Sequence, residues 1–155
     1  MTYRIEGLAP EPFRPFFAMD EAELASWNAR RVTAGETGGF PCRVSLEDAA
    51  PGERLILVNH VSHDVPTPFR TSYAIYVRER AERPAMFEDE VPPYLDRRTL
   101  GLRAFDAAGM LRKAALAMPG EAGEHIRALM ADGEVAAIHA HNAAHGCFLA
   151  RIERN

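Results

Sequence analysis

Lysine is almost absent from this sequence. Lys113 is the single lysine among 18 basic residues, and 22 acidic residues leave a formal net charge of −4. A protein that binds nucleic acid broadly needs a basic face to neutralise phosphates, so we expect no nucleic-acid partner. The excess of arginine reflects either the codon bias of a GC-rich genome or arginines that bind carboxylate or phosphate groups, which suit a planar guanidinium.

Long apolar runs and cysteine clusters are also missing. The longest aliphatic run, LILV at residues 55–58, is far too short to cross a bilayer. The first residues, MTYRIEGLAPEPF, lack the cationic start and apolar run of a secretory signal. The two cysteines, Cys42 and Cys147, are too few for a disulfide framework. We therefore expect a cytoplasmic protein with reduced thiols and no membrane partner.

The signature motifs of the common enzyme classes are absent as well. The chain contains no Walker loop, no G-x-G-x-x-G, no G-x-S-x-G and no H-E-x-x-H. Motifs therefore leave open whether the protein is an enzyme. A length of 155 residues, with 47% apolar and 26% charged residues, is typical of one globular domain with a core of its own.

Short apolar segments separated by proline and glycine make up most of the chain. Their alternation predicts six strands, at residues 54–60, 72–79, 100–106, 110–118, 134–142 and 147–153, and two shorter strands at 3–5 and 42–46. Helical spacing predicts one helix at residues 21–31, capped by Asp20, and another at 121–131. We expect a single α+β domain (residues 1–155) with a largely antiparallel sheet of about six strands and two helices. Residues 1–40 would form an N-terminal arm and helix, and residues 41–155 the core.

The turn that ends at Gly109 predicts a hairpin between residues 100–106 and 110–118. Glycine there suits a type I turn followed by a left-handed residue. This register places Phe105 opposite Leu111 and Leu102 opposite Ala114. It also places Leu116 on the same face as Leu100, Leu102 and Ala104, with Arg103 and Lys113 on the other.

The stretch HAHNAAHGC, residues 139–147, contains three of the six histidines. A tight turn within it would place His141 opposite Phe148 and His139 opposite Ala150. Because side chains alternate along a strand, His139 and His141 share one face, and Cys147 lies on the other. The histidine face carries no formal charge and is the better candidate for the core side. We expect His145 to be solvated in the turn.

Two imidazoles on one face suggest a metal site. An H-x-H pair on a strand offers both side chains to one ion, and a second pair, His60 and His63, stands in NHVSHD. If the strand at residues 54–60 lies near the last hairpin, His60, His63, His139 and His141 form a three- or four-histidine site, completed by Asp64 or water. Such ligands suit a transition metal such as zinc. The alternative is that these histidines are structural and are hydrogen-bonded or exposed.

Cysteine and arginine offer two further kinds of site. Cys42 stands beside Arg43 in PCR, and an arginine can activate a thiol, so Cys42 is a better reactive candidate than Cys147. Either cysteine could equally be a small buried hydrophobic residue. Five arginines could line an anion pocket, or could be solvated surface residues: Arg43, Arg70, Arg97, Arg98 and Arg103.

The order of several segments resembles a known family. FPCRVSLEDAAPGE, LILV, PFRTSYAIYVRE, RRTLGLRAFDAAGM and VAAIHAHNAAHGCFLARIER resemble the bacterial domain-of-unknown-function family 1203 from about Phe40 to the end of the chain. PCR at residues 41–43 and GCF at residues 146–148 are its most recognisable pieces. The resemblance implies a single-domain bacterial protein and no particular activity. It also makes Cys42 and Cys147 a pair that could lie near each other across the sheet.

Three function classes therefore remain. The first is a domain that binds a small ligand or metal ion near His60, His139 and His141. The second is a non-enzymatic structural or interaction module, expected to be a homodimer. The third is a thiol-based enzyme or redox sensor that uses Cys42 or Cys147.

Overall fold

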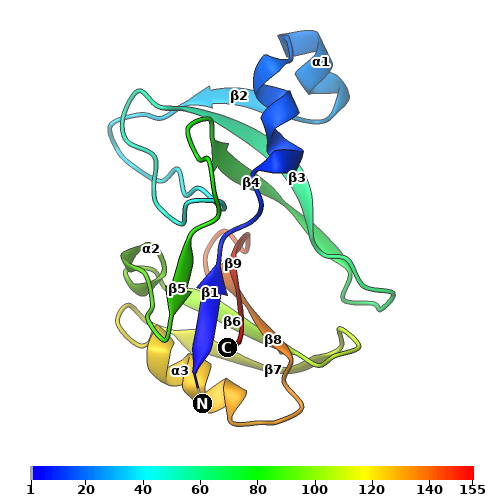
Figure 1. Ribbon diagram of the computed structural model, residues 1–155, viewed down its shortest axis with the longest axis vertical. Helices are drawn as coiled ribbons and strands as arrows, with labels where there is room; N and C mark the ends of the chain where they lie inside the picture. Colours follow the sequence, from blue (N-terminus) through cyan, green and yellow to red (C-terminus); the bar gives the residue numbers. More distant parts are fainter. Residues whose placement is uncertain (1) are drawn as a thin grey trace.

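The computed structural model describes residues 2–155 and has an α+β fold built on two antiparallel sheets (Figure 1). The smaller sheet and α1 lie in the upper part of the view, and the larger sheet, α2 and α3 lie in the lower part. The expected α+β class and a large antiparallel sheet of six strands are confirmed. The strands expected at residues 54–60 and 72–79 lie in a separate three-stranded sheet, however, and the described residues form four helices where two were expected.

The elements follow one another in a mostly hairpin-connected order. The larger sheet contains β1 (Tyr3–Glu6), β5 (Met86–Glu88), β6 (Leu100–Phe105), β7 (Leu111–Ala117), β8 (Ala137–Asn142) and β9 (Phe148–Arg154). The smaller sheet contains β2 (Arg30–Thr33), β3 (Arg54–His63) and β4 (Thr71–Arg78). The helices are the 3₁₀ helix η1 (Glu11–Ala18), α1 (Glu21–Ser26), α2 (Pro93–Asp96) and α3 (Ala122–Met130).

The strand order of the larger sheet is β5-β1-β9-β8-β6-β7. β1 is thus an interior strand, paired with β5 on one side and β9 on the other. β5 lies within a charged, proline-bounded connection that carries no alternating pattern, and three residues are too few to produce one. The short N-terminal strand was expected, but its interior position was not.

Each sheet has its own apolar core. One face of the larger sheet packs against α2 and α3, where Ile138, Ala140 and Ile152 contact the cluster that includes Ile126 and Met130. The smaller sheet packs against η1, α1 and the segment around Cys42 and Val44 in a second cluster. The opposite face of the larger sheet is therefore turned toward the smaller sheet, and the candidate sites lie between the two.

The first helix begins where it was expected and ends earlier. The Asp20 carboxylate accepts a hydrogen bond from the Glu23 backbone N–H at 2.8 Å, which confirms the predicted cap. The helix stops at Ser26 because Asn28 adopts the left-handed conformation (φ 53°), and Ala29 N then donates to Leu24 O, which completes a Schellman ending. The expectation of a helix to residue 31 was wrong, since residues from Arg30 onward form β2.

The predicted strand at residues 42–46 is instead a tight loop. Leu46 N donates to Cys42 O, and Leu46 has a left-handed backbone (φ 50°) that ends any extended run. Cys42 forms an isolated parallel bridge with Tyr76 of β4, and Arg43 N donates to Tyr76 O at 3.1 Å. The loop is therefore attached to the smaller sheet by its backbone.

β-Bulges change the register of both predicted hairpins. Phe105 opposes Leu111 as expected, but a bulge between Ala104 and Phe105 places Leu102 opposite Ala115 rather than Ala114. The prediction that Leu116 shares a face with Leu100 and Leu102 was wrong, because the shifted register pairs Leu116 with Gly101, and Leu116 is 60% exposed.

In the last hairpin, His141 opposes Phe148 as predicted. A bulge between Ala140 and His141 then places His139 opposite Arg151 instead of Ala150. His139 and His141 do share a face, but the helix-covered core lies on the other face, which carries Ile138 and Ala140. The two histidines are nevertheless buried, because their face meets the smaller sheet.

The Gly109 turn anchors the larger sheet to the end of β3. Gly109 has a positive φ of 85°, and a Cβ placed on it would lie 2.7 Å from Val65 Cγ1. Its carbonyl oxygen is 3.0 Å from His63 Nε2 and accepts from Thr67 Oγ1 at 3.3 Å. This turn is one of the places where the two sheets touch.

We predict that Gly109→Ala lowers the free energy of unfolding more than Gly120→Ala does. Gly120 has a similar φ of 88° but no neighbouring atom within 4 Å of its Cβ position, so it controls for backbone strain alone. Strain costs about 1 kcal/mol, and the clash with Val65 adds about 1–3 kcal/mol at Gly109. Urea denaturation of both variants measures the difference; equal losses would contradict the close contact.

Candidate functional site

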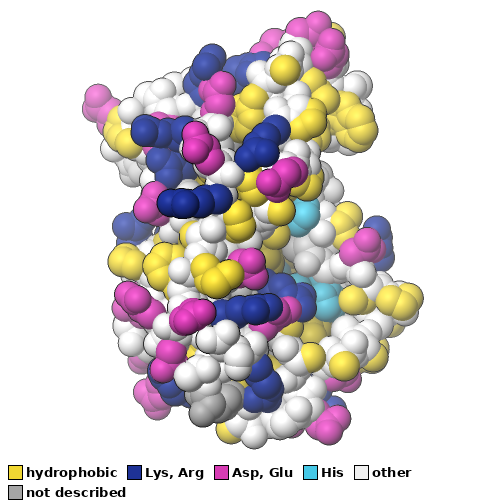
Figure 2. Space-filling view, viewed as in Figure 1, with side chains coloured by type: hydrophobic (Ala, Val, Ile, Leu, Met, Phe, Trp, Pro, Cys, Tyr) yellow, Lys and Arg dark blue, Asp and Glu magenta, His cyan; other side chains and the backbone are white. Residues whose placement is uncertain are grey.

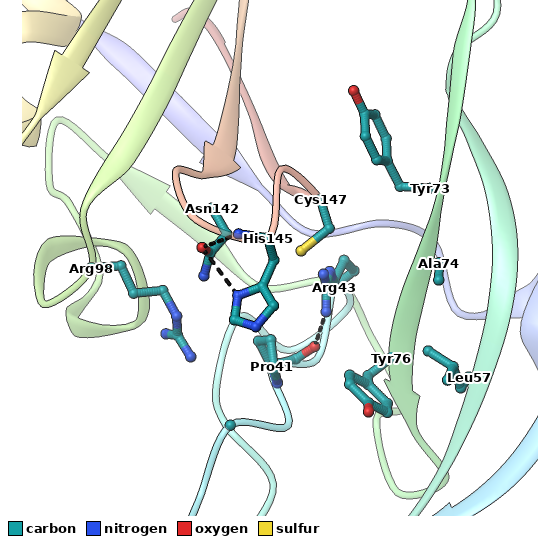
Figure 3. Close-up of a pocket in the computed structure, with 11 residues that line it drawn as sticks. Pro41, Arg43, Leu57, Tyr73, Ala74, Tyr76, Arg98, Asn142, His145 and Cys147 are labelled. Atoms are coloured by element: carbon teal, nitrogen blue, oxygen red, sulfur yellow. Dashed lines mark hydrogen bonds between the residues drawn. The ribbon is translucent and has the colours of Figure 1, made fainter.

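Two cavities lie between the sheets. The first, called here the arginine cavity, has a volume of about 550 Å³ and is lined by Arg43, Tyr73, Tyr76, Arg98, His145 and Cys147, among others (Figure 3). Its walls come from residues 39–43, from β3 and β4, from the residue after the α2 cap, and from the β8–β9 turn. The second, called the histidine cavity, has a volume of about 400 Å³ and is lined by Phe69, Arg70, Arg103, Phe105, His139 and His141, among others.

Arg43 is a buried cation in the wall of the arginine cavity. Its side chain is 1% exposed, Nε donates to Phe148 O at 2.8 Å, and Nη1 donates to Pro41 O at 2.6 Å. Within residues 2–155, no carboxylate forms an ion pair with it. Backbone carbonyls satisfy part of its hydrogen-bonding capacity but leave its charge unbalanced, and an unbalanced buried charge is costly.

Arg98 lies on the other side of the same cavity and is differently compensated. Its Nη2 donates to Asp48 Oδ1 at 2.6 Å, and its guanidinium carbon lies 5.0 Å from the centre of the Tyr94 ring. Burial lowers the pKa of Arg98 and raises that of Tyr94, and the positive charge of Arg43 partly opposes the shift of Tyr94. Asp48 also pairs with Arg97, so one carboxylate faces two guanidinium groups here. Arg43 is the arginine of the cavity wall that no carboxylate among residues 2–155 pairs with.

Of the two cysteines, Cys147 reaches the arginine cavity. Its side chain is directed into the cavity in Figure 3, where His145 also lies. His145 Nδ1 is 3.3 Å from Asn142 Oδ1. Cys42 is fully buried, and its sulfur accepts from the backbone N–H groups of Ser45 and Arg78. Both thiols are free.

Three of the four predicted metal-ligating histidines come together, and His60 does not join them. The ring centres of His63 and His139 are 5.0 Å apart, and those of His139 and His141 are 6.4 Å apart. His60 instead packs edge-on against Phe13, 5.7 Å away, whereas His63 follows a bulge at the end of β3 and contacts the larger sheet. Figure 2 shows histidine side chains at the surface of the hollow between the two parts of the molecule.

In each of these three histidines, one ring nitrogen already has a protein partner. His63 Nε2 faces the carbonyl of Gly109 and His141 Nδ1 faces that of Gly146, each at 3.0 Å, so both nitrogens carry hydrogen. Arg151 Nη1 can only donate to His139 Nε2 (3.4 Å), which assigns the hydrogen of His139 to Nδ1.

Across residues 2–155, no group of three or more His, Cys, Asp or Glu side chains is arranged to hold a metal ion. The tautomer of His139 accounts for part of this, since its Nε2 lone pair already accepts from Arg151 and its Nδ1 carries the hydrogen. Arg103 and Arg151 account for the rest, because guanidinium groups next to the cluster oppose a metal cation.

Burial keeps the two strand histidines neutral. It lowers the pKa of His139 to about 3, with further lowering by Arg151, His63, His141 and Arg103. It lowers the pKa of His141 to about 4, although the hydrogen bond to Gly146 opposes the shift. Because these imidazoles are neutral, they can be buried between the two sheets at lower cost than charged rings, which allows the sheets to pack against each other.

We predict that the protein loses stability on acidification well above the usual carboxylate range. A histidine whose pKa is lower in the folded state than its unfolded value of 6.5 stabilises the fold fully when the pH is above 6.5. This stabilisation is lost as the pH falls toward the pKa of the folded state. Between about pH 7.5 and about pH 5, His139 and His141 together would cost about 3–4 kcal/mol. His60, whose pKa burial also lowers, adds in the same direction.

Urea denaturation at the two pH values measures this loss. His139→Gln should reduce the pH-dependent part by roughly half, whereas His125→Gln on α3, whose side chain is 35% exposed, should leave it unchanged. A pH dependence that is the same in both variants would contradict a neutral, buried His139.

Four of the five arginines predicted to line an anion pocket divide between the two cavities. Arg43 and Arg98 line the arginine cavity, and Arg70 and Arg103 line the histidine cavity. Arg97 lines neither of them and pairs with Asp48. The sequence did not single out Tyr73 or Tyr76 as site residues, because the alternation of a regular strand says nothing about a cavity.

The fold and the cavities describe an α+β domain with a polar cleft between two antiparallel sheets. Residues 39–154 match the family described as "Protein of unknown function (DUF1203)", and the chain belongs to this family. No curated protein and no solved structure matches the chain. In the part of the chain that the structure describes, no helix combines the length and apolar character needed to cross a membrane.

Proposed function

We propose that the arginine cavity binds a small molecule that carries one acidic group on a largely apolar body. The observation that carries this proposal is the buried Arg43 guanidinium, which lines the cavity without a carboxylate partner among residues 2–155. An anionic group in the cavity would balance this charge. Little rearrangement would be needed, because two backbone carbonyls already hold the Arg43 guanidinium group in place.

The rest of the cavity suits an apolar body. Leu57, Tyr73, Ala74 and Tyr76 supply a mostly apolar wall from β3 and β4. A volume of about 550 Å³ falls within the range of small-molecule sites in proteins.

The two segments that most resemble the family also support this assignment. PCR and GCF are far apart in the sequence, yet Arg43 of the first donates to the carbonyl oxygen of Phe148 in the second. Arg43 and Cys147 both line the cavity. The parts of the chain that carry the family resemblance thus converge on the proposed ligand site.

A fluorescent pair of probes tests the proposal. Anilinonaphthalene sulfonate carries one anionic group on an aromatic body, and N-phenylnaphthylamine has the same body without the charge. We predict that the sulfonate binds at least about tenfold more tightly than the neutral probe, because only the sulfonate carries a charge opposite to that of Arg43. Bound sulfonate should also slow the alkylation of Cys147 by iodoacetamide, while the buried Cys42 stays unmodified throughout.

A blocking variant and a matched control locate the binding. Ala74→Phe places a ring in the cavity from an exposed strand position and should remove the preference for the sulfonate. Ala114→Phe makes the same change on an exposed position of β7, away from the cavity, and should leave it intact. Equal affinities for the two probes, or binding that survives Ala74→Phe, would refute the proposal.

A second candidate function is self-association through β7. This strand is an edge of the larger sheet, and it exposes Leu116 (60%) and Leu111 (37%) between the exposed Met110 and Met118. Edge strands with apolar side chains and open backbone groups readily pair with another strand. Lys113, a charge that would oppose such pairing, lies 3.1 Å from Asp132 of its own chain. The proposed partner is a second copy of the chain.

Light scattering coupled to gel filtration tests this second candidate. We predict a dimer whose dissociation constant rises at least about tenfold in Leu116→Arg, because a charge would then lie in the paired edge. Trp27→Arg, at an equally exposed apolar residue near α1, serves as the control and should not change the mass. A wild-type monomer at high protein concentration would rule out the dimer.

A further inference from the structure

The histidine cavity is a separate hollow next to the arginine cavity. Tyr73 lines the arginine cavity, and its hydroxyl accepts a hydrogen bond from Arg103 Nη1 at 3.0 Å. Arg103 in turn lines the histidine cavity together with His139 and His141. The pair Tyr73–Arg103 therefore stands between the two spaces, and the inference below does not depend on the function proposed for the first.

Positive charge accumulates around the histidine cavity. Arg103 has no ion-pair partner within residues 2–155, and its hydrogen bond goes to a neutral hydroxyl. Arg70 at the rim pairs with Asp64 at 2.9 Å, but both side chains are more than half exposed, so this pair is weak. The field of Arg103 reaches both strand histidines, whose pKa values burial lowers first and Arg103 lowers further. The cavity wall thus carries one guanidinium group that no carboxylate among residues 2–155 neutralises.

One buried hydrogen-bond donor in this wall also lacks an acceptor. His139 is 1% exposed, and its Nδ1 has no hydrogen-bond partner among the described residues. Because Arg151 donates to Nε2, this Nδ1 carries the hydrogen and is a donor. An unpaired buried donor costs about 1–3 kcal/mol, so a protein that retains one beside a cavity gains by offering it an acceptor.

The remaining wall of the cavity is aromatic and aliphatic. Phe69 and Phe105 have ring centres 6.5 Å apart, and Phe105 also packs against His139 with ring centres 5.1 Å apart. Leu111, 37% exposed, closes the side nearest to β7. These residues can surround a flat apolar group but cannot accept a hydrogen bond.

We propose that the histidine cavity is an oxyanion site that takes the phosphate or carboxylate group of a small aromatic ligand. Arg103 supplies the balancing charge, the His139 imidazole supplies a neutral donor after a small rotation of the ring, and Phe69 and Phe105 hold the aromatic part. Neutral histidines and an arginine without a carboxylate favour an oxyanion over a metal cation, which the same guanidinium would repel.

NMR of isotope-labelled histidine side chains in the full chain tests this inference with defined probes. Phenyl phosphate and benzoate are titrated in parallel, with phenol as the uncharged control of the same shape. The expected result is a saturable shift of the His139 and His141 ring signals with at least one of the two anions, and none with phenol. The signals are assigned with His139→Gln and His141→Gln, and the half-exposed His125 on α3 should not move.

Variants separate this site from the arginine cavity. Arg103→Gln should weaken binding about tenfold or more, and Leu111→Trp should block the cavity from its rim without touching the buried cluster. Ala74→Phe, which fills the arginine cavity, should leave these shifts unchanged. The inference is overturned if neither anion gives a saturable shift, if phenol gives the same one, or if the shift persists in Leu111→Trp.

If phenyl phosphate alone binds, the site is selective for phosphate, and if benzoate alone binds, it is selective for carboxylate. Either selectivity supports an oxyanion site. Because the arginine-cavity test uses the sulfonate probe and Ala74→Phe, each proposal can fail while the other stands.

Discussion

The structure depends on one buried cation. The Arg43 side chain starts in a loop attached to β4 and reaches the first residue of β9, so it spans the boundary between the two sheets. Removing a guanidinium from water is costly, and two carbonyl groups offset part of that cost by accepting hydrogen bonds from it. The Pro41 carbonyl belongs to the same loop as Arg43, so the bond to Phe148 is the one that crosses the boundary. Sliding one sheet past the other would leave this buried Nε donor unpaired. The arginine cavity lies beside this connection.

A second connection between the sheets uses neutral polar groups. His63 at the end of β3 faces the Gly109 carbonyl, and its ring lies against Phe105 and His139 of the larger sheet. The two connections differ chemically, because the first uses a guanidinium group, whereas His139 and His141 beside the second pack as uncharged rings. Protonation of these two rings at low pH therefore weakens this end of the boundary between the sheets.

Local patterns predicted the elements that have clear boundaries. Asp20 marked the start of α1, apolar strands such as β3 and β4 were evident from their composition, and strand alternation correctly placed His139 and His141 on one face. The predicted registers of the two hairpins were wrong beyond the bulges. An inserted residue shifts one strand against its partner but leaves the hydrophobic pattern of each strand intact, so the sequence gives no sign of it.

The sites could be predicted only in part, because they are made by contacts between distant segments. The contact of His63, rather than His60, with His139 depends on a bulge and on the docking of two separate sheets. Arg43 was recognised as an anion-binding candidate, yet its bond to Phe148 joins residues that no local rule connects. Sequence periodicity describes the faces of single strands, and a cavity between two sheets is a property of how those faces meet.

The interior place of β1 has a consequence for how the fold can be divided. β1 inserts Tyr3 and Ile5, which are 2% and 0% exposed, between β5 and β9, although it lies outside the residues that match the family. A fragment beginning at residue 39 would keep both neighbouring strands and lose the one between them. The fragment would have a gap where β1 lies, with unpaired backbone edges on β5 and β9 and empty pockets for the side chains of Tyr3 and Ile5. Because η1, α1 and β2 also precede residue 39, a peptide of residues 2–38 is the piece that restores the fold, so the fold lends itself to strand complementation between two separately made pieces.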